Sequence, residues 1–215
     1  MAGKKGETAP ARRGRPRAYD TEAALKRATE AFWKTGYSGT SLDSIAAATG
    51  MNPPSLYAAF GNKRGLYLEV LARYWEISLA GTREALAEDR PLAESLMLAY
   101  EAALSIYFSG KGNARGCFVV GTAVTEAGDD VTIRNNVAAG LRMIDADFEA
   151  RFRTALERGE LKPDADPAAL AVLAAATMHT IAIRARAGVG RTELRELARK
   201  AVSVICGCQP QAFAA

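Results

Sequence analysis

The sequence has few of the residues that most often carry catalysis, metal binding or cross-linking. It contains one histidine and three cysteines in 215 residues. One histidine excludes any catalytic scheme that needs two, and no serine elbow or thiolate–imidazole signature is present. An odd cysteine count in a chain of this length indicates a reducing compartment rather than a disulfide framework. We therefore expect a cytoplasmic protein that is not an enzyme and holds no cofactor or metal.

Long apolar runs are absent as well. The most apolar uncharged stretch runs from Pro167 to Ile183 and is shorter than the ~20 apolar residues that a membrane span requires. The N-terminal segment is charged and rich in Gly and Arg, without the apolar core of a signal peptide. The sequence therefore predicts a protein without membrane contact, in which 167–187 is a buried helix.

The alternating pattern of a half-buried β-strand is also missing, whereas helical periodicity runs through most of the chain. Caps and glycine stops divide this periodicity into segments. The pattern predicts an all-α fold of about nine helices. They include a short helix over Pro53–Phe60, with Asn52 as its N-cap and Gly61 at its end, a long helix that begins near Asp129 or Asp130, and a last helix that begins at Thr192. A short apolar stretch over 117–124 follows an expected loop over 109–116.

Positive charge gathers near the start of the chain. Up to Leu68, eleven Lys and Arg residues face five acidic residues, whereas the remainder has seventeen against nineteen. We expect a disordered basic arm over 1–18, a helical head over 19–65 and a larger body over 66–215. A basic front on a slightly acidic body indicates that the front faces a polyanion. A solubilising tail is the alternative that charge alone leaves open.

The clearest local pattern is a helix, a tight turn and a second helix between Thr40 and Phe60. Thr40, with Asp43 three residues later, is expected to cap the first of these helices. Gly50 allows the turn, and Leu56 packs the second helix onto the first. This is the arrangement of a helix-turn-helix.

Polar residues around this pattern are placed to contact duplex DNA. The N-terminal half of the second helix would enter a major groove, where side chains reach base edges. Helix N-termini on either side of it offer backbone N–H groups to phosphate, and two exposed prolines suit a thymine methyl. The predicted contacts are Thr40, Ser41, Asn52, Pro53, Pro54, Ser55, Tyr57 and Lys63.

Four short runs carry a resemblance to a known family. They read Thr-Ser-Leu-Asp-Ser-Ile-Ala over 40–46, Gly-Met-Asn over 50–52, Leu-Tyr-Ala-Ala-Phe over 56–60 and Lys-Arg-Gly-Leu over 63–66. This is similar to the DNA-binding signature of the tetracycline-repressor (TetR/AcrR) family. The resemblance implies a three-helix DNA-binding head, joined by a fourth helix to a six-helix body that dimerises and binds ligand.

Carried over by position, the resemblance implies that Tyr57 and Lys63 grip the phosphate backbone and that Thr40 anchors the second helix. Residues 52–55 then lie where the family reads base sequence. The pair Pro53-Pro54 departs from the polar residue and glycine of many members. That departure argues against direct hydrogen-bond readout by residue 53.

The basic arm is a second candidate contact. Its Gly-Arg-Pro-Arg core over 14–17 resembles the AT-hook, in which arginines enter a narrow A/T-rich minor groove. We therefore predict DNA contacts from Arg15 and Arg17. The alternative is a solvated tail that only raises nonspecific affinity.

For the body, the resemblance implies a small-molecule site whose occupation shifts the fourth helix and releases a palindromic operator, as in a repressor. Candidate pocket residues are large or adaptable side chains on faces expected to point inward, with plain core packing as the alternative for each. They are Trp75, Tyr100, Tyr107, Phe118, Met143, Phe148, Met178 and His179.

The apolar segment 168–183 suggests self-association. A surface helix of a monomer shows one apolar stripe, whereas this segment is apolar on nearly every side. Its many alanines permit close helix approach. We expect a homodimer through the two C-terminal helices, because obligate interfaces resemble a core cut in half.

Two alternative functions follow from single features. Cys117 lies beside Arg115 at an expected helix N-terminus, a setting that lowers a thiol pKa, so the chain is alternatively a thiol-based redox-sensing regulator. A buried, inert cysteine is the other interpretation. The basic arm would also suit an architectural binder of A/T-rich DNA.

Overall fold

The computed structural model describes residues 21–87, 89–110 and 112–207. Within these residues the chain forms nine α-helices and one π-helix, which confirms the predicted all-α class. The helices are α1 (Thr21–Thr35), α2 (Leu42–Thr49), α3 (Pro53–Phe60), α4 (Lys63–Ala85), α5 (Leu92–Tyr107), the π-helix η1 (Val119–Ala123), α6 (Val124–Glu126), α7 (Val131–Glu157), α8 (Pro167–Arg186) and α9 (Arg191–Ile205). The basic arm, with Arg15 and Arg17, lies outside the described residues.

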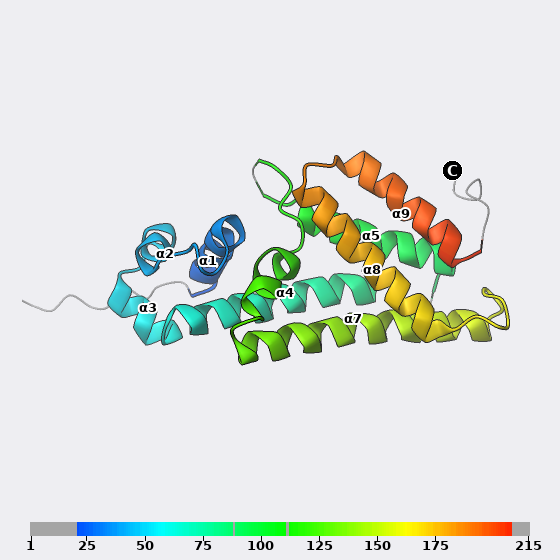
Figure 1. The fold of residues 1–215 in the computed structure, drawn as a ribbon, viewed down its shortest axis with the longest axis horizontal. Helices are drawn as coiled ribbons and strands as arrows, with labels where there is room; N and C mark the ends of the chain where they lie inside the picture. The colour runs from blue at the N-terminus through cyan, green and yellow to red at the C-terminus, as the bar shows by residue number, and fades with distance from the viewer. Residues whose placement is uncertain (1–20, 88, 111, 208–215) are drawn as a thin grey trace, which may run out of the picture.

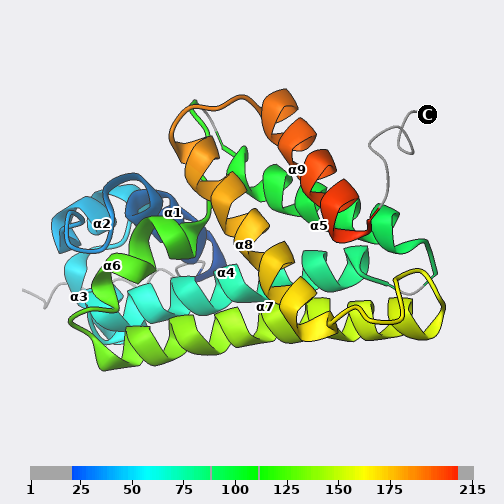
Figure 2. The same cartoon turned by 45° about the vertical axis from the view of Figure 1, so that its right-hand side comes forward.

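The helices are arranged as a small head at one end of an elongated body (Figure 1). Helices α1–α3 form the head, and α4 leads out of it to run alongside α7 (Figures 1 and 2). Helices α5, α8 and α9 pack together above this pair in Figure 2, with α5 against α4 and α8 against α7. Because α4 begins at Lys63, one continuous helix crosses the expected boundary between residues 65 and 66.

Aromatic side chains join the head to the body. The Phe118 ring lies 5.5 Å from Trp33 of α1 and 5.6–5.8 Å from Tyr74 and Tyr67 of α4, measured between ring centroids. Phe118 and Tyr67 are fully buried. Aromatic pairs at these separations add to the stability gained from burial alone. The core is therefore continuous from the head into the body.

The capping of α2 differs from the sequence prediction. Ser41, not Thr40, is the N-cap, and it forms a reciprocal box with Ser44: the Ser44 N–H donates to Ser41 Oγ at 3.0 Å, and the Ser41 N–H donates to Ser44 Oγ at 3.1 Å. Thr40 is only 2% exposed, and its hydroxyl donates to the carbonyl of Gly36. Burial in the α1–α2 turn therefore prevents Thr40 from capping α2.

Helix α8 is long and apolar enough by length and composition to span a membrane. In this fold one of its faces packs into the body, against α5, α7 and α9. The opposite face leaves Val172, Leu173 and Ile183 more than half exposed. The prediction of a buried helix therefore holds, within this chain, for one side of α8.

Candidate nucleic-acid interface

The α2–turn–α3 unit is fixed by a left-handed residue and a network around the turn. Gly50 has φ of +70°, and its N–H donates to the Ala46 carbonyl at 2.9 Å. Before it, the Thr49 hydroxyl donates to the Ile45 carbonyl and accepts from the Met51 N–H. This network sets the angle at which α3 leaves α2.

Helix α3 presents one face to solvent and one to the head. Leu56 is buried against α2, whereas Asn52, Pro53 and Pro54 are exposed and Tyr57 is 48% exposed. Asn52 is the N-cap that was predicted, and its side-chain oxygen accepts from the Ser55 N–H at 2.9 Å. Its side-chain NH₂ group is left as a donor toward solvent. Because α3 holds no charged residue, its exposed face suits base edges and thymine methyls rather than phosphate alone.

Lys63 lies at the first position of α4, and Asn62 caps that helix. Its ammonium nitrogen is 4.3 Å from the centroid of the Tyr37 ring, a separation at which the ring attracts the cation. Tyr37 in turn lies 4.9 Å from the Tyr67 ring. The sequence reasoning missed Tyr37. The signal that would have found it is an aromatic residue one position after the glycine that ends α1.

The other predicted head contacts are placed unevenly. Ser41 is exposed at the N-terminus of α2, and Ser55 is half-buried in the first turn of α3. The Thr40 hydroxyl is buried and within 2.7 Å of the Thr35 hydroxyl, so a phosphate contact from its side chain is ruled out in this conformation. The structure thus brings Ser41, residues 52–57 and Lys63 together in the head, without the Thr40 side chain.

Comparison with known proteins assigns the chain. The family model described as bacterial regulatory proteins, tetR family, matches residues 24–70, and the model described as tetracyclin repressor-like, C-terminal domain, matches residues 94–202. The chain belongs to the TetR family of bacterial regulatory proteins. This membership confirms a transcriptional regulator rather than an enzyme.

Similar proteins match this TetR-family chain over most of its length. It is 33% identical over 186 residues to the HTH-type transcriptional repressor ComR of Escherichia coli, covering 86% of this chain and 89% of ComR. A solved structure of a cysteine-substituted CifR, a TetR-family regulator in complex with 26-base-pair operator DNA, has 32% identity and a TM-score of 0.79. That match covers 88% of this chain and 98% of the CifR chain.

The predicted ligand residues of the TetR-family body are mostly core. Six of the eight are buried: Trp75, Tyr100, Tyr107, Phe118, Phe148 and Met178. The prediction that Met143 points inward is wrong, because α7 turns it outward and leaves it 39% exposed. His179 is half-buried, and burial lowers the pKa of its imidazole below the ordinary value.

The environment of Cys117 fits the buried-cysteine interpretation rather than the setting that lowers a thiol pKa. Burial raises the pKa of its thiol, although the Tyr74 hydroxyl donates to its sulfur at 3.1 Å. The neighbouring Arg115 does not offset this effect, because its guanidinium points to Glu30 and lies over the Trp33 ring. The thiol is therefore protonated at neutral pH in this conformation.

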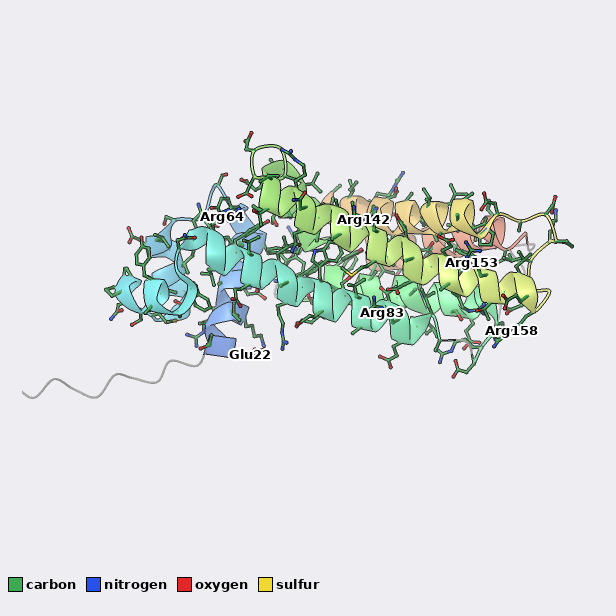
Figure 3. All side chains as sticks on the ribbon, turned by 90° about the horizontal axis from the view of Figure 1, so that it is seen from below. Glu22, Arg64, Arg83, Arg142, Arg153 and Arg158 are labelled. Atoms are coloured by element: carbon green, nitrogen blue, oxygen red, sulfur yellow. The ribbon has the colours of Figure 1, made fainter. Side chains whose placement is uncertain are left out.

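Ion pairs connect the head to the body. Arg64, at the start of α4, donates through Nε and Nη2 to both carboxylate oxygens of Asp130, the N-cap of α7 (Figure 3 labels Arg64). Arg64 and the backbone N–H groups of Ile133 and Thr132 hold the pKa of Asp130 well below its usual range. Ser38, in the α1–α2 turn, donates to Glu126 of α6. These contacts join the head to α6 and α7.

Proposed function

We propose that this protein is a cytoplasmic repressor that binds a palindromic operator as a homodimer and releases it when a small molecule occupies the body. The observation that carries this proposal is the uncharged, solvent-facing surface of α3, flanked by Lys63 and by the exposed cap of α2. The name of ComR as a repressor and the operator complex of CifR support it. Phosphate contacts from Lys63 and Tyr57 would position α3, and residues 52–55 would read bases.

The outer face of α8 supports a dimer. Val172, Leu173 and Ile183 form an exposed apolar face along this helix, and Val204 of α9 is also exposed. Exposed apolar patches of this kind mark interaction sites rather than ordinary surface. Two copies that pack these helices together would place two heads on successive major grooves, about 34 Å apart along the duplex.

Release by a small molecule requires that the ligand favours one arrangement of the head over another. The Arg64–Asp130 and Ser38–Glu126 contacts supply a route, because each joins the head to a helix of the body. A shift of α6 or α7 would therefore alter the spacing between the two heads of a dimer.

A thiol-based response is the second candidate function. Cys117 lines a groove of about 430 Å³ between η1 and α8, together with Gly121 and Arg186. The raised pKa argues against a reactive thiolate in this conformation. A Cys117→Ser protein that no longer releases DNA in peroxide, where the unsubstituted protein does, would favour this candidate over the small-molecule one.

Selection of bound duplexes from random sequence tests the main proposal. We expect a palindromic site to be enriched, whereas an architectural binder would enrich A/T-rich DNA without symmetry. Leu173→Glu should give a monomer that loses the palindrome preference. The control is Val131→Glu, because Val131 on α7 is about as exposed as Leu173; this variant should remain dimeric. A monomer that still selects the full palindrome would contradict the dimer, and the absence of an enriched motif would contradict the repressor.

A further inference from the structure

Lys63 differs from its neighbour Arg64 in the group that its charge meets. Arg64 pairs with the carboxylate of Asp130, whereas Lys63 has no carboxylate partner among the described residues. Its ammonium nitrogen instead lies 4.3 Å from the centroid of the Tyr37 ring. An aromatic face attracts a cation without neutralising it. Lys63 therefore keeps its full charge for a further partner.

The contact with Tyr37 leaves part of the ammonium group open. An ammonium group has three N–H donors, and one ring face covers only one side of it. The Lys63 side chain is half-buried, so the donors that point away from the ring can reach a phosphate oxygen. Contact with Tyr37 and contact with a phosphate are therefore compatible.

The backbone around Tyr37 is fixed on both sides. Gly36 has φ of +75°, and its N–H donates to the Phe32 carbonyl at 2.8 Å. The Tyr37 carbonyl accepts from the Thr40 N–H at 3.2 Å. With its backbone held in this way, the Tyr37 ring orients the lysine rather than following it.

Two buried rings hold the Tyr37 side chain. Its ring centroid lies 4.9 Å from that of Tyr67 and 6.2 Å from that of Phe32. Tyr67 and Phe32 are fully buried and meet edge to face at 5.1 Å. No hydrogen bond of the Tyr37 hydroxyl is found among the described residues. The position of Tyr37 therefore depends on ring packing, and above all on Tyr67.

Tyr67 is in turn bonded to the body. Its hydroxyl lies 2.7 Å from the hydroxyl of Thr122, which is buried in the π-helix η1. Thr122 donates its one hydroxyl proton to the Phe118 carbonyl at 2.8 Å, so the Tyr67 hydroxyl is the donor of the pair. Short π-helical turns of this kind are frequent at functional sites. A series of direct contacts thus runs from η1 through two tyrosines to Lys63.

We propose that Tyr37 is a positioning residue for the phosphate contact of Lys63, and that η1 sets its place through the Tyr67–Thr122 hydrogen bond. The ring restricts the lysine side chain before the duplex arrives, so less conformational entropy is lost on binding. A change of η1 reaches the DNA-facing surface by this series of contacts, separately from the Arg64–Asp130 pair. The inference rests on the proposed function, in which Lys63 contacts the operator backbone.

The position of Lys63 over the ring has a spectroscopic readout of its own. Protons above an aromatic face resonate upfield, so the ε-methylene protons of Lys63 report the contact in the full chain labelled with ¹³C-lysine. Lys63→Ala identifies their signal by removing it. We expect an upfield shift in the unsubstituted protein and in Tyr37→Phe, which keeps the ring, and its loss in Tyr37→Leu.

A double variant tests the part played by η1. Tyr67→Phe with Thr122→Val replaces both partners of the buried hydrogen bond by apolar groups of similar shape, a change that costs little stability. The ring of residue 67 stays in place, but its link to η1 is lost. We expect the upfield shift of Lys63 to become smaller in this variant.

Operator affinity measures the consequence for DNA binding. Tyr37→Leu should weaken operator binding by roughly two- to fivefold, which corresponds to an exposed contact between a cation and a ring. Tyr37→Phe should bind like the unsubstituted protein. In the Lys63→Ala background, Tyr37→Leu should have no further effect, because a positioning residue acts only through the lysine. A general disturbance of the head would persist in that background.

Lys63→Ala separates this inference from the proposed function. If it leaves operator affinity unchanged, the phosphate contact itself is refuted. If it weakens binding but Tyr37→Leu does not, or if Tyr37→Leu weakens binding equally with and without Lys63, positioning by Tyr37 is overturned. An ordinary Lys63 shift in the unsubstituted protein overturns the ring contact. An unaltered shift in Tyr67→Phe with Thr122→Val overturns the role of η1.

Discussion

At the scale of single residues, Lys63 shows how a cation is held in place before a duplex arrives. Its ammonium group lies over the Tyr37 ring at the first position of α4, so less side-chain freedom is given up when it meets a phosphate. Tyr37 itself is fixed by its contact with Tyr67. The predicted phosphate contact therefore has a supporting residue that the motif alone did not include.

Lys63→Ala should weaken operator binding by roughly tenfold and lower the slope of affinity against salt by about the amount expected for one phosphate. Titration of the operator at several salt concentrations measures both. Lys162→Ala is the control, since Lys162 is exposed in the loop between α7 and α8, far from the head. An unchanged salt slope in Lys63→Ala would show that Lys63 does not neutralise a phosphate.

His179 predicts a pH dependence of stability. Burial lowers its folded-state pKa below 6.5, so the unfolded chain binds a proton more readily than the folded one. The free energy of unfolding should therefore fall as pH drops below about 6.5, and should level off below the folded pKa. It is the single histidine of the chain. Urea unfolding of the unsubstituted protein and of His179→Gln, between about pH 5 and 8, should show a smaller slope in the variant.

Which residues could be predicted depends on whether neighbours in sequence decide their roles. Asn52 as the cap of α3 was predicted correctly, because a following proline and a local N–H acceptor define that position. Thr40 and Ser41 are adjacent and chemically alike, and only the burial of Thr40 in the α1–α2 turn selects Ser41 as the cap. Met143 was expected on an inward face of its helix, but its side chain is 39% exposed on α7.

At the scale of elements, the turn between α2 and α3 depends on the backbone of Gly50. Gly50→Ala places a Cβ at φ +70°, which costs about 1–2 kcal/mol in that conformation. The free energy of unfolding should fall by that amount, and operator affinity should fall with it because α3 would tilt. Chemical denaturation and operator titration check both effects.

Gly190→Ala is the matched control for this prediction. Gly190 precedes α9 with φ of −68°, and an added Cβ there meets nothing within 4 Å. Alanine at that position should leave operator affinity unchanged. Equal decreases of stability in both variants would mean that the left-handed conformation of the turn is not what requires Gly50.

The elements differ in how well the sequence predicts them. Helix α3 was predicted with its correct bounds, since Asn52, Pro53 and Gly61 mark its ends locally. The stretch 117–124 was predicted only as apolar, whereas it forms η1 and the start of α6. The chain packs closely on α8 just before this stretch: a Cβ at Gly116 would lie 2.5 Å from the Ala182 carbonyl oxygen. Such a contact between distant segments leaves no periodic signal in the sequence.

At the scale of the whole molecule, the division of charge and the apolar face of α8 were readable from composition, but the links between head and body were not. Arg64 and Asp130 are separated by 66 positions, and Ser38 and Glu126 by 88. Neither pair differs in type from ordinary surface residues. Their partnership follows from the packing of α4 on α7 and of the head on η1.

The distribution of positive charge gives the last prediction. Residues 1–18 contain six Lys and Arg against one Glu, whereas in the described head Arg64 pairs with Asp130 and Arg27 donates to the Thr49 carbonyl. Removal of 1–18 should lower operator affinity and flatten its salt dependence, by about 0.9 in slope for each phosphate that the arm neutralises. Preference for the operator over random duplex should persist, because the proposed function assigns base reading to α3, which holds no charged residue.

Replacing only Arg15 and Arg17 by glutamine distinguishes a minor-groove contact from a solvated tail. If these arginines enter a narrow groove, affinity should fall more on operators with A/T-rich flanks than on operators with G/C-rich flanks, because the narrow A/T groove carries the stronger negative potential. Equal decreases on both flanks indicate nonspecific attraction alone. No decrease on either, with the salt slope also unchanged after removal of 1–18, would mean that the arm takes no part in DNA binding.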